Sequence, residues 1–331
     1  VDLVLARAEG PYMEQIPAGV RLVDLKAPRV LESVPALVKY LQHERPTALL
    51  SAMFTNIVAV WARRLSGVHH RLIINEQNTL SSLAGNKHDL RWKLYPKLAA
   101  WFYPCANHIT AVSHHVADDL ARVTKIPSHR IQVIYNPVVT PDLQTKAEVP
   151  LEHPWFRAGE PPVALAIGRL TDQKAFDVLI QAFSLVRKNQ PVRLLILGEG
   201  ENRPALQSLI LQLKLEEDVS LLGFVQNPYP YISHSSLFVL PSRWEGLPTV
   251  LIEALYLGAS IVATDCPGGS REILKDGRYG ELVPVDAPLR LAEAIAESLN
   301  DRRPCPPKES WRPYHLDLVV DRYLSLLFGV S

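Results

Sequence analysis

The sequence predicts an α/β fold with two domains, each built on a doubly wound parallel sheet. Short apolar runs rich in β-branched residues alternate with longer stretches of helical period along the whole chain. Strands that are buried on both faces are apolar throughout, and parallel strands need helical crossovers between them. The chain has 331 residues, which is enough for two domains of ordinary size. A polar, proline-rich stretch at 140–162 separates the two alternating sets.

The elements follow in order along the chain. In the first half we expect strands at 1–6, 20–25, 47–52, 71–75, 108–113 and 131–136, with helices at 30–43, 55–66, 89–103 and 113–124. In the second half we expect strands at 163–168, 193–198, 219–223, 237–241, 260–264 and 280–284, with helices at 174–188, 203–213, 248–257 and 288–299. Ligands of such sheets bind outside the carboxyl ends of the strands, here in a cleft between the domains.

These patterns divide the chain into a first domain at 1–145, a linker at 146–162 and a second domain at 163–305. A last amphipathic helix is expected within 306–331. The chain begins with an apolar run and without methionine, so we expect a further element upstream of Val1.

Composition excludes several classes of protein. The formal net charge of +1 argues against a nucleic-acid partner, because no strongly basic field covers the molecule. No run reaches the ~18 apolar residues that a membrane-spanning helix needs. Three scattered cysteines (Cys105, Cys266 and Cys305) have neither metal-ligand nor disulfide spacing, which favours a reducing cytoplasm and no bound metal.

Polar residues follow the strands of the second half at the edge where ligands bind. Arg169 leaves the strand at 163–168, and Lys174 enters the first turn of the next helix. A cation is disfavoured at a helix amino end, so Lys174 indicates an anion nearby, although a solvated lysine is the commoner case. Gly198 and Gly200 allow either a tight turn or close approach to a ligand.

The stretch SRWEGLPTVLIEALYLG at 242–258 carries the strongest signal. Gly246 makes a turn after a strand and Pro248 opens a helix whose first amides lack partners inside the helix, which is an anion site. Glu253 is the only ionisable residue between Thr249 and Gly258. Its carboxylate needs hydrogen-bond donors, either the hydroxyls of a ribose or a protein group.

Another glycine-rich turn follows the strand at 260–264. Gly268 and Gly269 can expose amides, and Glu272 lies on a short helix after them. Four strand ends of one sheet therefore present glycine, a cation or a carboxylate, which indicates a site for a nucleoside diphosphate.

The chain at this point resembles the retaining glycosyltransferases of family 4, also called group 1, with the GT-B fold. The motifs GR…K, LGEGE, GF, LPSRWEGLPTVLIEAL, ATDCPGG and EIL..GRYG.LVPV stand in the family's order, and Glu245 and Glu253 have the spacing of its paired glutamates. The resemblance implies two Rossmann-like domains and a carboxyl-terminal helix that crosses back to the first. It also implies metal-independent transfer from a nucleotide sugar, most often a UDP-sugar, to a surface polysaccharide, lipid-linked oligosaccharide or glycolipid.

The resemblance also implies residue roles. Arg169 and Lys174 would bind the donor diphosphate, Glu253 the ribose, and Glu245 the donor sugar or the phosphate loop. Arg169, Lys174 and Glu245 are thus the expected catalytic residues. The remaining expected donor contacts are Gly168, Gly198, Gly200, Phe224, Val225, Gly246, Leu247, Thr249 and Val250.

Two departures from the family concern the first domain. The family's opening strand and glycine-rich loop would lie before Val1. Where many members carry a histidine, this chain has Gln77, between Glu76 and Asn78. We expect Glu76, Gln77 and Asn78 on the acceptor or sugar side, and no general base is assigned. We expect the departing phosphate oxygen to help deprotonate the acceptor, with retention of configuration.

The segment 86–104 mixes basic and aromatic residues. They are Arg91, Lys93, Lys97, Trp92, Tyr95, Trp101 and Tyr103. Such a helix can rest on an anionic membrane surface or hold a lipid-linked acceptor. It can also be a packed helix with a solvated face, which is the commoner situation.

Two further functions stay open on sequence grounds. A sugar phosphorylase or nucleotide-sugar epimerase can share the fold, because fold does not determine function. A non-catalytic nucleotide-sugar binder or scaffold would fit the altered 75–79 stretch.

Overall fold

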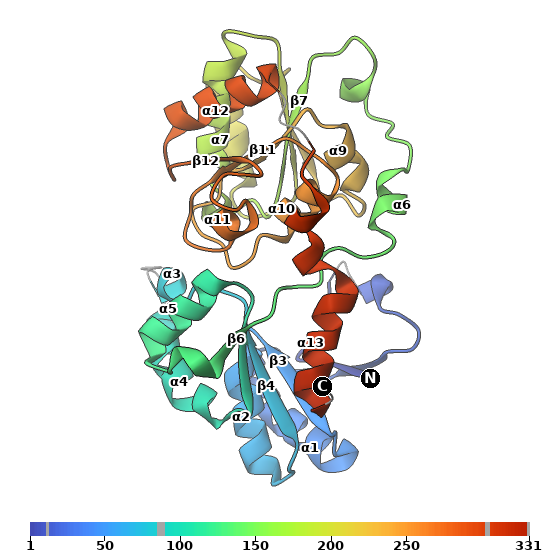
Figure 1. The fold of residues 1–331 in the computed structure, drawn as a ribbon, viewed down its shortest axis with the longest axis vertical. Coiled ribbons are helices and arrows are strands. Elements are labelled where there is room, and N and C mark those ends of the chain that lie inside the picture. The colour runs from blue at the N-terminus through green and yellow to red at the C-terminus, as the bar shows by residue number, and fades with distance from the viewer. Residues whose placement is uncertain (11–12, 85–89, 302–304, 330–331) are drawn as a thin grey trace. The chain divides into compact units, whose positions relative to one another are not determined.

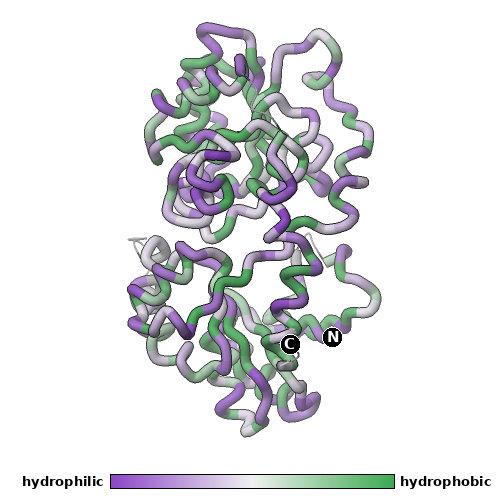
Figure 2. The backbone as a smooth tube through the Cα atoms, in the orientation of Figure 1, coloured by the Kyte–Doolittle hydropathy of each residue, from purple (hydrophilic) through white to green (hydrophobic). Residues whose placement is uncertain are grey.

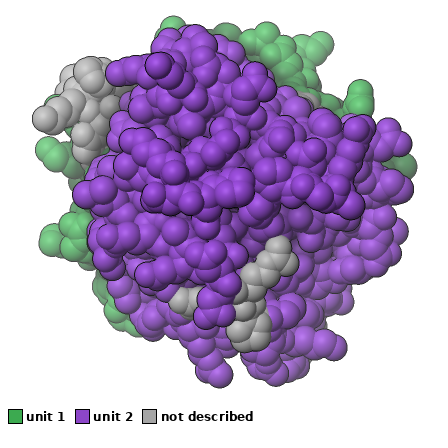
Figure 3. Space-filling view, turned by 90° about the horizontal axis from the view of Figure 1, so that it is seen from above, with its two compact units in different colours: residues 1–112, 116–134, 322–331 green, residues 113–115, 135–321 purple. Residues whose placement is uncertain are grey.

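The computed structural model describes residues 1–10, 13–84, 90–301 and 305–329 (Figure 1). Internal contacts divide the chain into two compact units (Figure 3). Unit 1 comprises residues 1–112, 116–134 and 322–331, and unit 2 comprises residues 113–115 and 135–321. Unit 2 thus includes the whole polar segment 140–162, and α13 (Leu316–Phe328) has its last turns in unit 1.

Unit 1 contains two parallel sheets. In the first, β1 (Asp2–Leu5) pairs with β2 (Arg21–Asp24). The second has the order β3 (Ala48–Ala52), β4 (Arg71–Glu76), β5 (His108–Ala111) and β6 (Ile131–Val133). The helices are α1 (Val34–Glu44), α2 (Thr55–Ser66), α3 (Leu80–Ala84), α4 (Leu90–Phe102) and α5 (His114–Thr124). Every strand expected in this half is present, whereas α3 was not predicted.

The apolar faces of α1 and α2 hold one part of unit 1 together. Leu37 and Leu41 of α1 pack with Val58 and Ala62 of α2, and strand residues from both sheets lie against this cluster. The end of α13 is attached to β4 by Arg71, whose guanidinium donates to the carbonyl of Leu326 at 3.0 Å. This bond satisfies one of the carbonyls that a helix carboxyl end leaves without an intrahelical partner.

Unit 2 contains one six-stranded parallel sheet. Its order is β12 (Glu281–Val283), β11 (Ile261–Thr264), β10 (Leu237–Leu240), β7 (Val163–Ile167), β8 (Arg193–Leu197) and β9 (Val219–Gly223). Its helices are α6 (Leu143–Ala147), α7 (Phe176–Arg187), α8 (Arg203–Gln212), α9 (Tyr229–His234), α10 (Thr249–Tyr256), α11 (Ser270–Ile273) and α12 (Pro288–Asn300). All six strands expected in this half are present.

Alternate residues of the strands point to the same face of the sheet and build the core of unit 2. Ala164, Ala166, Leu194 and Ile196 project to one face of the sheet, where α7, α8 and α12 bury their apolar sides against them. Figure 1 shows α7 and α12 together beside β7. The apolar stretches of the chain in Figure 2 follow the strands, as a sheet covered on both faces requires.

The segment expected to be a linker contains regular structure. Leu143 and Ala147 of α6 are buried, and α6 packs against α9. Asn227 and Ser233 donate side-chain hydrogen bonds to the carbonyls of Lys146 and Ala147. Two apolar residues four positions apart were too weak a pattern to predict this helix. Within the described residues, no helix has the length and apolar character needed to cross a bilayer, and Cys105, Cys266 and Cys305 are free thiols.

A buried carboxyl group lies at the carboxyl end of β4 in unit 1. Glu76 is 1% exposed. Its Oε1 accepts hydrogen bonds from the amides of Gln77 and Asn78 at 3.0 and 3.1 Å, and its Oε2 accepts one from the Tyr103 hydroxyl at 2.7 Å. Burial raises the pKa of Glu76 to about 7, although these three donors oppose the rise. Glu76 therefore shapes the turn after β4 from inside the unit, and its place on the acceptor or sugar side stays a prediction.

Glu76 makes stability depend on pH. Its pKa in the folded chain, about 7, exceeds its ordinary value of 4.5, so the folded state binds the proton more tightly. We expect the free energy of unfolding to fall by up to roughly 3 kcal/mol as pH rises from about 4.5 to about 7. Urea denaturation across this range, compared with Glu76→Gln, measures the effect.

The matched control is Glu32→Gln, since Glu32 is exposed in the same unit. It should keep the pH profile of the parent chain, whereas Glu76→Gln should lose the part of the slope that Glu76 contributes. An unchanged profile in Glu76→Gln would show that this carboxyl is already ionised throughout the range.

Candidate functional site

The candidate site lies where the strand order of unit 2 reverses. The first strand of the sheet, β7, has β8 on one side and β10 on the other, so consecutive crossovers leave it in opposite directions. At such a point the loops after the two central strands diverge and leave room for a ligand. The loop after β7 carries Lys174, and the loop after β10 carries Glu245.

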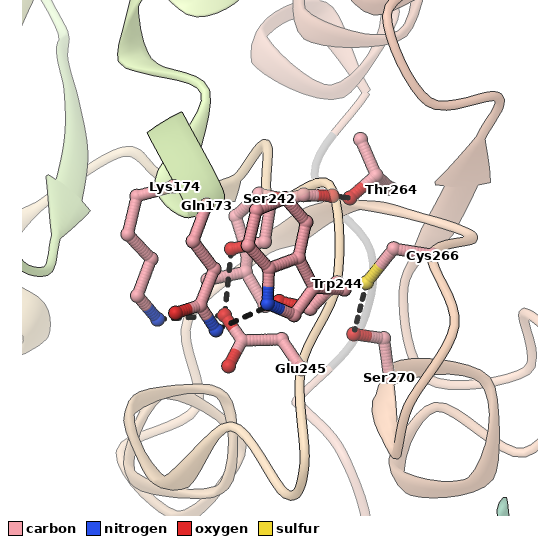
Figure 4. Close-up of polar contacts among 9 residues, drawn as sticks. Gln173, Lys174, Ser242, Trp244, Glu245, Thr264, Cys266 and Ser270 are labelled. Atoms are coloured by element: carbon pink, nitrogen blue, oxygen red, sulfur yellow. Dashed lines mark hydrogen bonds and ion pairs between the residues drawn. The ribbon is translucent and has the colours of Figure 1, made fainter. Parts of the chain in front are cut away.

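Lys174 and Glu245 form an ion pair across this point. Lys174 Nζ lies 2.6 Å from Glu245 Oε1, and Ser242 Oγ donates to the same oxygen at 2.6 Å (Figure 4). The two charged side chains are only 13% and 7% exposed. A pair this shielded from water is maintained only with close geometry and added hydrogen bonds, and removal of one partner leaves a buried charge. The sequence placed both residues at the site but did not predict that they pair.

The loop after β7 is shaped around the lysine side chain. Lys174 ends a short 3₁₀ turn (Asp172–Lys174), and α7 begins only at Phe176 after Ala175 in the left-handed region. The expectation that Lys174 lies in the first turn of the helix is therefore wrong, because α7 begins two residues later. A Cβ on Gly168 would lie 3.1 Å from Lys174 Cε, so this glycine makes room for the lysine stem.

The glycine-rich turn after β11 supports the Glu245 loop. The Glu245 amide donates to the Pro267 carbonyl at 2.8 Å, and the Gly269 amide donates to the Gly246 carbonyl at 2.9 Å. Gly268 has φ +137°, and a Cβ there would lie 2.5 Å from the Glu245 carbonyl oxygen. Only glycine tolerates both this conformation and this contact. The two glycines were expected to expose amides to a ligand, but they instead hold the residue beside Lys174.

The turn into α10 presents backbone donors next to the ion pair. The amides of Gly246, Leu247, Thr249 and Val250 make no hydrogen bond to any residue that the structure describes. Pro248, which lies inside this set, has no amide hydrogen to leave unpaired. Unpaired amides at a helix amino end bind anions, as the sequence predicted for this turn.

Glu253 lies on the second turn of α10 and is partly exposed. Burial raises the pKa of its carboxyl group to about 7, and a hydrogen bond from the Tyr229 hydroxyl acts in the opposite direction. The Glu253 carboxyl group, which needs a hydrogen-bond donor, thus has a protein donor in Tyr229. Tyr229, at the start of α9, was missed because 24 residues separate it from Glu253 without any shared motif.

The other predicted donor contacts lie on loops of the same unit. Arg169 is exposed and makes no ion pair or side-chain hydrogen bond with any described residue. Phe224 is exposed and Val225 is half-buried after β9.

Gly198 and Gly200 are explained by packing between two loops of unit 2. Added Cβ atoms would lie 2.0 Å from the Gly168 oxygen and 2.4 Å from the Leu170 oxygen. These glycines therefore let the loop after β8 pack on the loop after β7. Close approach to a ligand is not needed to explain them.

Ser113, His114 and Tyr135, which are far from 242–272 in the sequence, also join this site. Ser113 Oγ donates to the Gly246 carbonyl at 3.2 Å. Glu272 accepts hydrogen bonds from the His114 amide at 2.9 Å and from the Tyr135 hydroxyl at 2.5 Å. Sequence analysis noted Glu272 but missed its two partners and the bond from Ser113 to Gly246, since nothing local marks a pairing over such separations. Gln77 and Asn78 belong to unit 1 and are half-buried.

The arrangement as a whole favours a dianion. One paired lysine, one exposed arginine and four unpaired amides converge on the loops after β7 and β10, and the nearby carboxyl group of Glu253 can accept hydroxyl hydrogen bonds. Cations and helix amino ends stabilise phosphate, and carboxylates bind ribose hydroxyls.

Two protein-family models match this chain. The model for glycosyl transferases group 1 matches residues 152–314, and the model for Glycosyltransferase Family 4 matches residues 1–141. Together they cover almost all of the structure, with the candidate site inside the first match.

Individual proteins agree with the models. The chain is 33% identical over 246 residues to the N-acetylgalactosamine-N,N'-diacetylbacillosaminyl-diphospho-undecaprenol 4-alpha-N-acetylgalactosaminyltransferase of Campylobacter jejuni, a match that covers 74% of this chain and 65% of that protein. The chain thus spans slightly less than two thirds of that relative.

Solved structures show the same fold at low identity. Sucrose-phosphate synthase from Thermosynechococcus elongatus superposes with a TM-score of 0.79 at 18% identity and covers 100% of this chain and 89% of that one. Anabaena HepE in complex with UDP gives 0.72 at 18% identity, over 94% and 86%. The chain belongs to the group 1, family 4 glycosyltransferases, with the GT-B fold.

Proposed function

We propose that this chain transfers a sugar from a nucleoside-diphosphate sugar to a glycan acceptor, with retention of anomeric configuration and without a metal ion. The observation that carries the proposal is the buried Lys174–Glu245 pair beside the unpaired amides of 246–250. Breaking the anomeric C–O bond sends an electron pair to the diphosphate. Preorganised positive charge aimed at that group supplies much of the acceleration in such reactions.

Each cation has a role in this proposal. Lys174 has three donor hydrogens, so it can bind a phosphate oxygen while it keeps its bond to Glu245. Arg169, with no described protein partner, can close on the second phosphate from solvent. Glu245 holds the ammonium in place and faces the sugar end, which makes it the residue whose position matters most for the reacting centre.

Glu253 and its neighbours would bind the nucleoside. An ionised Glu253 accepts hydrogen bonds from the two ribose hydroxyls, and the exposed Phe224 offers a surface for the base. UDP is the nucleotide that we propose, supported by its presence in the HepE complex.

The acceptor that we propose is a lipid-linked oligosaccharide or a growing surface polysaccharide. The name of the Campylobacter relative, which acts on a diphospho-undecaprenol glycan, supports this class. Such an acceptor would place the reaction at the cytoplasmic face of a membrane. A screen of nucleotide sugars that measures released nucleoside diphosphate tests the donor class, and free phosphate as acceptor separates transferase from phosphorylase. If neither nucleoside diphosphate is released nor sugar is transferred, the chain would be a non-catalytic nucleotide-sugar binder.

Lys174→Met should lower kcat by about 10²–10³, because one preorganised cation at the leaving group is lost. The same change strands the buried Glu245 carboxylate and should cost about 3–5 kcal/mol of stability. Steady-state kinetics and urea denaturation are measured on the same preparation.

The double variant Lys174→Met/Glu245→Gln separates these effects. It removes the stranded charge, so stability should largely return while activity stays low. Full activity in folded Lys174→Met would remove this residue from the mechanism.

Donor binding should weaken below pH 7. The carboxyl group of Glu253 has its pKa raised to about 7, and only its ionised form accepts both ribose hydrogen bonds. Below this pKa the affinity should fall by up to about tenfold per pH unit. Calorimetric titration with UDP-glucose, whose diphosphate does not titrate near neutral pH, measures it.

Two substitutions identify the titrating group. Glu253→Gln should bind weakly at every pH, and Tyr229→Phe should move the transition to higher pH, because the tyrosine hydrogen bond lowers the pKa of Glu253. A transition that persists unchanged in Glu253→Gln would assign the pH dependence to another group.

Activity should survive an excess of chelator. The proposed charge neutralisation comes from Lys174, Arg169 and backbone amides, and it requires no divalent cation. The measurement compares turnover with and without EDTA, and then with added magnesium. Loss of turnover in EDTA that magnesium restores would contradict a metal-independent mechanism.

A further inference from the structure

One face of α4 in unit 1 is exposed, basic and aromatic. Lys93, Lys97 and Trp101 follow one another at intervals of four residues, so they form one stripe along the helix. Both lysines are exposed, Leu94 beside them is exposed, and Trp101 is 78% exposed. We call Lys93, Leu94, Lys97 and Trp101 the Trp101 face.

The opposite side of α4 supplies the packing. Tyr95 and Ala99 are buried, as is Tyr103 in the following turn. The hydroxyls of Tyr95 and Tyr103 lie 3.0 Å apart, and the Tyr103 hydroxyl donates a hydrogen bond to Glu76. The helix therefore has its core contacts without Trp101, which lies on the solvent side.

Further cations lie at the carboxyl end of this face. Arg130 donates to the Pro104 carbonyl at 3.4 Å, and Arg63 of α2 donates to Asn107 Oδ1 at 2.8 Å and to the Cys105 carbonyl at 3.5 Å. These bonds place two guanidinium groups next to the turn that follows Trp101.

The charged residues of α2 and α4 have one sign. Residues 55–75 and 90–117 include α2 and α4 and contain no aspartate or glutamate, although the whole chain has 34 acidic residues against 35 lysines and arginines. On the neighbouring α5, Asp119 is buried and paired with Arg122, and Asp118 is exposed. The near-neutral total charge therefore conceals a local positive patch.

We propose that the Trp101 face binds the surface of an anionic lipid bilayer. Trp101 and Leu94 enter the interfacial region, where an indole ring is favoured, and Lys93, Lys97 and Arg130 lie against the lipid phosphates. The inference concerns a separate surface of unit 1 and does not depend on the reaction proposed above.

The exposed apolar side chains decide between lipid and other anions. A nucleic acid would satisfy the cations but would leave Leu94 in water. A single exposed apolar side chain is common on a solvated helix face, but Trp101 and Leu94 lie beside cations of one sign. The bilayer interface is the partner that accommodates the cations and the apolar groups together.

Co-sedimentation with vesicles tests the inference. The chain should bind vesicles of phosphatidylcholine with phosphatidylglycerol and not those of phosphatidylcholine alone, and added salt should weaken binding. Lys93→Glu/Lys97→Glu should lower the partition coefficient at least about 25-fold, because each cation near an anionic surface contributes roughly fivefold. Trp101→Ala should lower it about tenfold through lost apolar burial.

Matched controls change the same chemistry elsewhere. Lys39→Glu/Lys188→Glu has the same charge change at exposed lysines, and Leu211→Ala removes an apolar side chain that is 60% exposed. Both should bind like the parent chain. All variants change exposed residues, and circular dichroism together with calorimetric titration of UDP checks that they fold and keep the donor site.

Three results would overturn the inference. They are no sedimentation with anionic vesicles at low salt, equal loss in the control variants, and binding that duplex DNA displaces fully while Trp101→Ala has no effect. The last result would assign the patch to a nucleic acid.

Discussion

The ion pair between Lys174 and Glu245 is the constraint around which unit 2 is arranged. Two charges with little access to water are maintained only if their geometry is held closely. Gly168 leaves room for the lysine stem, Ser242 adds a donor to the shared oxygen, and Gly268 brings a second loop against the Glu245 backbone. Loops that follow three different strands thus converge on one bond, at the point of the sheet where a ligand has room.

Burial raises the pKa of two carboxyl groups, Glu76 and Glu253, that have different roles. The pKa is about 7 in both cases. The oxygens of Glu76 are occupied by two backbone amides and Tyr103 within unit 1, so this residue shapes a turn. Glu253 is partly exposed and retains acceptor capacity beside the hydrogen bond from Tyr229. Access to the surface, rather than the pKa, separates a structural carboxyl group from one that can bind a ligand.

The glycines of unit 2 have two distinct structural roles. At the turn into α10, Gly246 belongs to a set of amides without described partners, as an anion site requires. At Gly198, Gly200 and Gly268, a side chain would collide with a neighbouring loop. A glycine-rich motif therefore reports close backbone approach, and only the coordinates tell whether the approaching group is a ligand or another part of the chain.

The sequence by itself determined the α/β class, all twelve strands and the loops that carry the site, because buried parallel strands and crossover helices leave strong local periodicities. It also brought Lys174, Glu245 and Glu253 to one sheet edge, since the carboxyl ends of parallel strands share that edge. Only the tertiary structure decided that Lys174 pairs with Glu245, that Tyr229 bonds Glu253, that Glu76 is buried and that Trp101 is exposed. These outcomes depend on contacts between residues distant in sequence or on which helix face meets the core, and no local pattern encodes either.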